Sequence, residues 1–140
     1  MDFQLITLEG VKIDEQVYEV IIPTADGEIA VFPDHEALIS VAVPGVVQVR
    51  KKKGDADSRM EFFAISGGML EVGGNRLRIL VDEADHGADI VEAESKAALE
   101  RAVALRENAQ DQVELEQAHQ LVDRHAVRLK VAELHRRHRR

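Results

Sequence analysis

The chain has 140 residues, enough for one compact domain with an appendage, and its 26 acidic and 18 basic residues give a net charge of −8. This charge argues against general nucleic-acid binding, which requires a basic face, and the lack of cysteine excludes disulfides and thiolate chemistry. The apolar runs are too short for a membrane span, and the first residues lack the positive charge of a signal peptide. We therefore expect an intracellular protein.

The first part of the chain has the pattern of short β-strands. Alternating or β-branched runs occupy residues 3–7, 17–22, 29–32, 46–49, 60–66, 69–72 and 76–81. Turn signals separate the runs, among them the Asp26-Gly27 pair and the Gly73-Gly74-Asn75 segment. This spacing predicts an all-β sandwich or barrel within residues 1–86.

The second part, residues 87–140, has the pattern of long helices. Glycine, proline and aromatic residues are absent from residues 88–140, as is typical of uninterrupted helices. Narrow, alanine-rich apolar stripes recur at helical spacing over residues 90–107 and 112–135. The break at 108–111 contains neither glycine nor proline, so the pattern leaves a hairpin and a single rod both open. The predicted fold class is a mainly β N-terminal sandwich followed by a C-terminal α-helical domain.

The helical part is divided by charge. Residues 87–123 hold 9 acidic and 3 basic residues, whereas residues 124–140 hold 7 basic residues and 1 acidic residue. A helix C-terminus favours a few cations, but not this many. We interpret the basic end as a surface for an acidic protein partner, with anionic lipid or nucleic acid as the alternative. The apolar face here lacks the large side chains that seat interfacial helices in lipid.

No segment carries the signature of an enzyme or a metal site. The sequence contains no phosphate-binding loop, dinucleotide fingerprint or nucleophile elbow. Residues 34–36, Asp-His-Glu, are interpreted as a surface loop rather than as acid–base machinery, and residues 82–86 as an exposed linker. His135 and His138 lie one helical turn apart, but the neighbouring arginines disfavour a bound cation. We therefore expect no catalytic residue and no metal.

Several segments, in this order and spacing, resemble the epsilon subunit family of the bacterial F-type ATP synthase. The resemblance covers nearly the whole chain. The matching segments are Phe3–Gly10, Pro23–His35 with Leu38, Pro44–Val46, Ile65–Val72, Ile79–Ala84 and Arg128–Ala132.

The resemblance implies a β-sandwich with a C-terminal helical hairpin in a non-catalytic subunit of the central stalk. The sandwich would bind the gamma subunit and the membrane rotor ring, coupling proton flow to ATP synthesis. Glu28 matches the family's turn glutamate near the rotor ring, and His35 matches the histidine of its loop facing gamma. The location implied is the cytoplasmic face of the bacterial plasma membrane, reached only through the complex.

In the family, the helices lie folded on the sandwich or extend into the catalytic head, where they block ATP hydrolysis. The resemblance makes the basic tail, Arg136, Arg137, Arg139 and Arg140, a candidate inhibitory element that would contact an acidic surface of the catalytic head. When the hairpin is folded, the basic segment 124–140 would instead pair with the acidic first helix.

Some family members bind ATP on the folded hairpin, through a motif of Ile or Leu, Asp, two free positions, Arg and Ala. Residues 90–95 align with this motif, but Val91 replaces the aspartate and Glu94 replaces the arginine. Arg124 and Arg128 match the second-helix arginines of that site. Because a carboxylate now stands where a cation would face phosphate, we expect weak ATP binding or none, and no other cofactor.

A competing interpretation from the residues alone is an independent ligand-binding β-sandwich with a helical dimerisation tail. It would predict a concave, aromatic-lined site, although the chain has only five aromatic residues.

Overall fold

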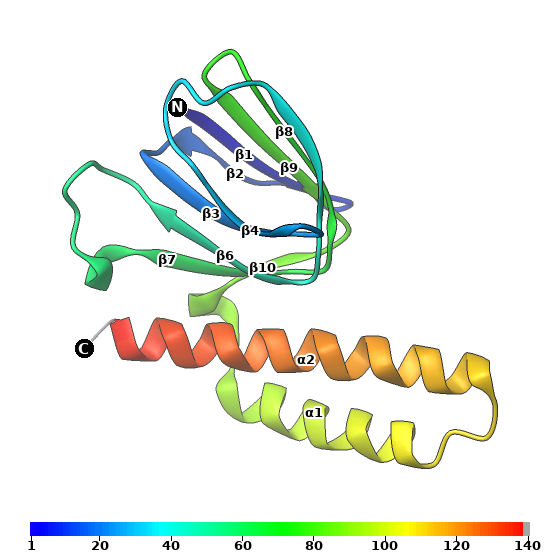
Figure 1. Cartoon of the computed structure of the whole chain (residues 1–140). Coiled ribbons are helices and arrows are strands. Elements are labelled where there is room, and N and C mark those ends of the chain that lie inside the picture. The colour runs from blue at the N-terminus through cyan, green and yellow to red at the C-terminus, as the bar shows by residue number, and fades with distance from the viewer. Residues whose placement is uncertain (139–140) are drawn as a thin grey trace.

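The computed structural model describes residues 1–138, in which ten β-strands precede two long α-helices (Figure 1). The strands are β1 (Asp2–Thr7), β2 (Gly10–Gln16), β3 (Glu19–Thr24), β4 (Gly27–Val31), β5 (Leu38–Ala42), β6 (Gly45–Arg50), β7 (Glu61–Ile65), β8 (Gly68–Gly73), β9 (Arg76–Val81) and β10 (Ala84–His86). The helices are α1 (Glu92–Glu107) and α2 (Gln112–His138). The predicted fold class is confirmed.

One continuous sheet folds over to make the two layers of the sandwich. Its strand order is β10-β7-β6-β3-β5-β8-β9-β1-β2, with β4 added to β3. Only the Thr24–Ala42 pair joins β3 to β5, and there the sheet passes from one layer to the other. The first layer is β10, β7, β6, β3 and β4, and the second is β5, β8, β9, β1 and β2. All strand pairs are antiparallel except β1 with β9.

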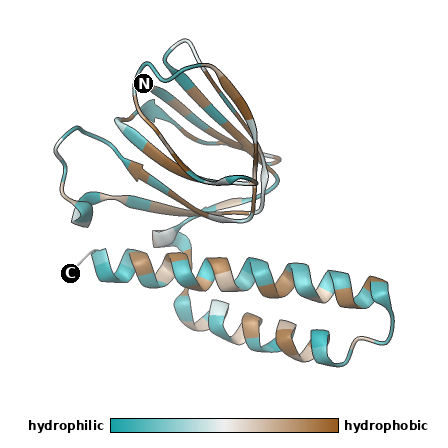
Figure 2. Ribbon diagram, viewed as in Figure 1, coloured by the Kyte–Doolittle hydropathy of each residue, from teal (hydrophilic) through white to brown (hydrophobic). Residues whose placement is uncertain are grey.

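Aliphatic side chains from both layers fill the space between them. Strands β1 and β9 alternate between buried and partly exposed residues, the period that the sequence pattern indicated. Hydrophobic and hydrophilic residues correspondingly alternate along strands of the sandwich (Figure 2). Phe3, Leu5, Leu70, Leu77 and Ile79 are completely buried in this core. The sandwich therefore has its own hydrophobic core, separate from the helices.

Three of the observed strands were not predicted from the sequence. Strand β2 has no buried residue and pairs only with β1, so its sequence carries no core-facing pattern. Strand β5 has apolar residues on both of its faces, and the face that carries Ile39 and Val41 is exposed. Strand β10, predicted as part of an exposed linker, instead pairs with β7 through residues 84–86. Strand β10 carries Asp85, which pairs with Arg128 of α2.

The two helices form an antiparallel hairpin, which decides the alternative that the sequence pattern left open. Asn108 Nδ2 donates to the carbonyl of Ala104 at 2.8 Å and closes the end of α1. Asp111 Oδ1 accepts from the amide of Glu114 at 2.8 Å and begins α2 as a capping residue. These two polar caps replace the glycine or proline that the break lacks. Within residues 1–138, no helix is long and apolar enough to cross a membrane.

Helix α2 lies between the sandwich and α1 (Figure 1). A second apolar cluster, the docking cluster, joins α2 to the outer face of the first layer; its buried members are Met60, Phe62, Ala64, Ile90, Val131 and Ala132. The chain enters α1 through a short 3-10 turn, Gly87–Asp89, which touches α2 closely. A Cβ on Gly87 would lie 2.8 Å from Cβ of His135, so a larger residue would push α2 away.

Candidate functional site

The outer faces of the two layers differ in what covers them. Helix α2 covers part of the first layer, whereas within residues 1–138 no helix packs on the second. Across the second layer runs a row of cross-strand neighbours on five strands, the outer apolar row: Val41, Met69, Leu80, Ile6 and Val11. Val41 and Val11 are each 57% exposed and Met69 is 41% exposed. Leu80 and Ile6, between Met69 and Val11, are partly exposed, so the row presents apolar surface of the kind that interaction sites use.

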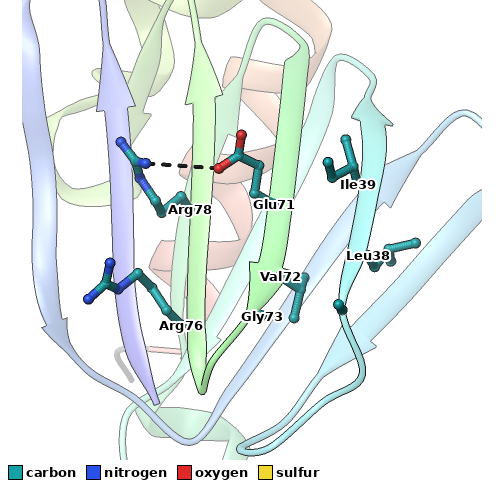
Figure 3. A pocket seen from close by; sticks show the side chains of 8 residues that line it. Leu38, Ile39, Glu71, Val72, Gly73, Arg76 and Arg78 are labelled. Carbon is teal, nitrogen blue, oxygen red and sulfur yellow. Dashed lines mark ion pairs between the residues drawn. The ribbon is translucent and has the colours of Figure 1, made fainter.

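Beside the outer apolar row, the same face is hollowed and carries charge. The hollow has a volume of about 700 Å³ and lies over β5, β8 and β9 (Figure 3). Arg78 and Glu71 point toward one another across neighbouring strands, with 3.9 Å between Nη1 and Oε2. Ile39, which is 71% exposed, lies on the adjacent strand. The face therefore offers apolar area with a charged margin, as protein–protein interfaces do.

Glu28 and His35 lie at opposite ends of β4. Glu28 is exposed beside the β3–β4 turn. His35 is half-buried in the loop after β4, where its Nδ1 lies 2.7 Å from the carbonyl oxygen of Glu36. The amide of Asp34 in the same loop donates to Oδ1 of Asn75, in the β8–β9 turn, at 3.0 Å. The structure does not bring Glu28 and His35 together into one site.

Arg124 and Arg128 both reach from α2 to the end of the sandwich. Arg124 Nη2 lies 2.7 Å from Oε2 of Glu83, and Arg128 pairs with the carboxylate of Asp85. Sequence reasoning missed both carboxylates, because residues 82–86 were interpreted as a linker. The signal that could have identified them is their alternate spacing, which places Glu83 and Asp85 on one face of an extended segment.

Arg124 and Arg128 also line a hollow of about 460 Å³ between the helices, together with Val91, Glu94 and Arg101. The structure thus brings together the positions that the resemblance aligned with an ATP site. Arg101, seven residues after Glu94 and on the same helical face, was not identified from the sequence. The carboxylate of Glu94 faces the same space, and Arg124 and Arg128 already have carboxylate partners. This donor set fits a phosphate chain poorly.

His125 lies in the same hollow, and burial lowers its pKa, assisted by Arg124, Arg128 and Arg101. The folded chain therefore binds this proton less readily than the unfolded chain, and the free energy of unfolding falls as pH drops through about 6.5. We expect His125→Gln to flatten this dependence, because the variant removes the titrating group, and the effect should be small because the side chain is only partly buried. Urea unfolding at pH 5.5 and 7.5 measures the difference.

The matched control for that experiment is His119→Gln on the exposed face of the same helix. It should leave the pH dependence of stability as it is in the unmodified chain. An equal flattening by both variants would contradict the role assigned to burial of His125.

The basic tail lies at the far end of α2. Arg136 Nε pairs with Oε2 of Glu92, at the start of α1, at 3.0 Å, and Arg137 is exposed. Arg139 and Arg140 lie outside the described residues. The expectation that the basic end pairs with the acidic first helix holds for Arg136 alone among the ion pairs in residues 1–138, because Arg124 and Arg128 pair with the sandwich instead.

Two other kinds of site, a metal site and an aromatic-lined ligand pocket, find little support in residues 1–138. Within residues 1–138, no three histidine, aspartate or glutamate side chains gather as a metal site would require. The hollows described above are lined by neither phenylalanine nor tyrosine, so they do not match the aromatic-lined site of a stand-alone ligand-binding sandwich.

The chain is a β-sandwich with a docked helical hairpin, and the uncovered outer face of the second layer presents an apolar row with charged neighbours, an architecture suited to binding a partner. The same fold occurs in chains of two solved mitochondrial ATP synthases. One is from Euglena gracilis, in an OSCP/F1/c-ring structure, with a TM-score of 0.79 and 24% identity over 96% of this chain and 81% of that one. The other is from Tetrahymena thermophila, in a central stalk/c-ring structure, with a TM-score of 0.61 and 15% identity over 94% and 96%.

Sequence comparison places the chain more narrowly. Residues 1–87 match the model of the β-sandwich domain of the ATP synthase delta/epsilon chain. The ATP synthase epsilon chain of Herpetosiphon aurantiacus is 32% identical over 136 residues, covering 97% of this chain and 96% of that protein. The chain belongs to the ATP synthase delta/epsilon chain family.

Proposed function

We propose that the chain is the non-catalytic epsilon subunit in the central stalk of a bacterial F-type ATP synthase, where it couples proton translocation to ATP synthesis. Residues 1–86 would form the part that binds gamma and the rotor ring, and residues 87–140 the regulatory part. Family membership and the match over nearly the full length of an epsilon chain support this role. As part of that complex it would be peripheral, on the cytoplasmic face of the plasma membrane.

The observation that carries the proposal is the outer apolar row. Val41, Met69 and Val11 expose apolar surface that a partner would remove from water, at about 25 cal/mol per Å². We assign gamma as the partner on this face, with the His35 loop at its margin. Glu28 lies at the other end of β4, which suits a second and separate contact with the rotor ring.

The hairpin is proposed as the inhibitory element. The apolar contact that attaches the hairpin to the sandwich is small, because the docking cluster has six buried members. Ile90, just before α1, belongs to the cluster, but no residue of α1 does. A small attachment permits release of α2 with its basic tail, which would then contact an acidic surface of the catalytic head. The donor set around Arg124 and Arg128 supports weak regulatory ATP binding or none.

The test is an assembled synthase in which Arg136, Arg137, Arg139 and Arg140 are all replaced by alanine. We expect ATP hydrolysis to rise at least about twofold, because the inhibitory contact loses four cations, while the subunit still co-purifies with gamma. The control removes exposed lysines from the sandwich, Lys52→Ala with Lys53→Ala, and should leave hydrolysis unchanged. Unchanged hydrolysis in the tail variant would remove the tail from inhibition, and purification as a free homodimer would refute the stalk role.

A further inference from the structure

We propose that the segment joining the sandwich to α1, residues 83–92, is an ionic latch that sets how often α2 leaves the sandwich. This inference rests on the regulatory role proposed for the hairpin and names the contact that controls it. The latch is a set of three carboxylates on the joining segment that pair with three arginines of α2.

The three ion pairs connect the same two segments in the same order. Glu83 pairs with Arg124 at 2.7 Å, Asp85 pairs with Arg128, and Glu92 pairs with Arg136 at 3.0 Å. Arg124 and Arg128 are one helical turn apart and lie on the same side of α2, and Arg136 follows about two turns later, turned by roughly 80° from Arg128 toward the start of α1. Two of the carboxylates flank or belong to β10, which is fixed to β7. Arg124 and Arg128 are therefore held to the sandwich, whereas Arg136 is held to the start of α1.

The placement makes the pairs act on docking rather than on folding. When α2 swings away from the sandwich, the Glu83 and Asp85 pairs must break together, whereas the caps that close the hairpin at 108–111 need not change. The core of the sandwich also stays intact, because it is separate from the docking cluster. The latch can therefore open without unfolding either part.

Solvent exposure keeps the latch adjustable. The paired side chains are roughly a quarter to a half exposed, so each pair contributes only a modest fraction of the docking free energy and is screened by salt. The docking cluster beneath them is apolar and responds little to salt. The charges also have a second role, because the carboxylates occupy Arg124 and Arg128 while α2 is docked. Release frees these arginines for an acidic partner.

The chain has no cysteine, so a single introduced thiol reports docking without interference. Val131 is fully buried between α2 and the sheet, and Val131→Cys becomes reactive only when α2 leaves. In this background, the isolated full chain with Glu83→Gln and Asp85→Asn should be labelled by a thiol reagent about three to ten times faster. Raising KCl from 0.05 to 1 M should accelerate labelling of the parent chain and have less effect on the variant.

The matched control is Glu100→Gln with Glu107→Gln, which removes two charges from α1 that form no ion pair within residues 1–138. This control should be labelled at the parent rate; acceleration equal to that of the latch variant would mean that general charge, not the latch, holds α2. A reciprocal exchange, Glu83→Arg with Arg124→Glu, should restore slow labelling relative to Glu83→Arg alone.

Parent-rate labelling of the Glu83→Gln, Asp85→Asn chain, or an exchange that restores nothing, would overturn the latch. These measurements need neither the synthase nor nucleotide. The inhibition assay on the assembled enzyme is independent of them. A negative result for the latch can therefore be distinguished from a negative result for the stalk role.

Discussion

Replacing Val131 with aspartate is expected to detach α2 from the sandwich and leave both parts folded. Val131 is completely buried against Phe62 and Ala64, so the substitution loses the burial of one valine and places a carboxylate in an apolar contact. Together these effects should weaken docking by more than about 3 kcal/mol. Tryptic cleavage after Arg128 and Lys130 should accelerate at least about tenfold, while circular dichroism retains the helical signal.

The control on the same helix is Val113→Asp, at a valine that is 63% exposed near the start of α2. It adds the same charge without entering the docking cluster and should leave the cleavage rate unchanged. Equal protection of Arg128 in both variants would mean that the docking cluster does not hold α2.

A pair of aspartates in the outer apolar row, Val41→Asp with Met69→Asp, should abolish the proposed binding to gamma. The two residues are direct cross-strand neighbours and both are exposed, so the isolated chain should keep its stability. An apolar interface would instead have to desolvate two adjacent carboxylates, and we expect affinity to fall more than about 100-fold. Calorimetric titration of the isolated chain into its gamma subunit measures this loss.

Leu105→Asp is the control for that experiment, because Leu105 is a similarly exposed apolar residue on α1, away from the sandwich. It should bind gamma with the affinity of the unmodified chain. Full affinity in the double variant would move the gamma contact to another face of the sandwich.

The sequence was informative where one face of a strand is buried and the other is not. Strands β1 and β9 alternate clearly, and both were predicted close to their observed bounds. Strand β2 could not be found in this way, because an outer strand without buried residues depends on hydrogen bonds to its neighbour rather than on a core-facing pattern. Strand β10 is only three residues long and depends on its pairing with β7.

In the candidate site, too, residues with a local sequence pattern were predicted and residues that meet only through the fold were not. Spacing on one helix placed Arg124 and Arg128 together, and the resemblance aligned them with Val91 and Glu94, which line the same hollow. The partners Glu83 and Asp85 were missed, because no local pattern tells which face of a short strand a distant helix will cover. The outer apolar row is likewise invisible in the sequence, since its five residues become neighbours only through strand pairing across the second layer.

The position of the docking cluster gives the hairpin a mechanical property. The α2 residues that pack in the cluster lie between 127 and 134, near the joining segment. Toward its other end, α2 stands over a hollow of about 680 Å³ beside Pro44 and Ser66. With 27 residues, α2 is a lever about 40 Å long, fixed near one end. Measured from the middle of the docking cluster, near residue 130, the start of α2 lies about 27 Å away, so a rotation of about 10° would carry it and the attached end of α1 some 5 Å, a displacement large enough to change contacts with a neighbouring subunit.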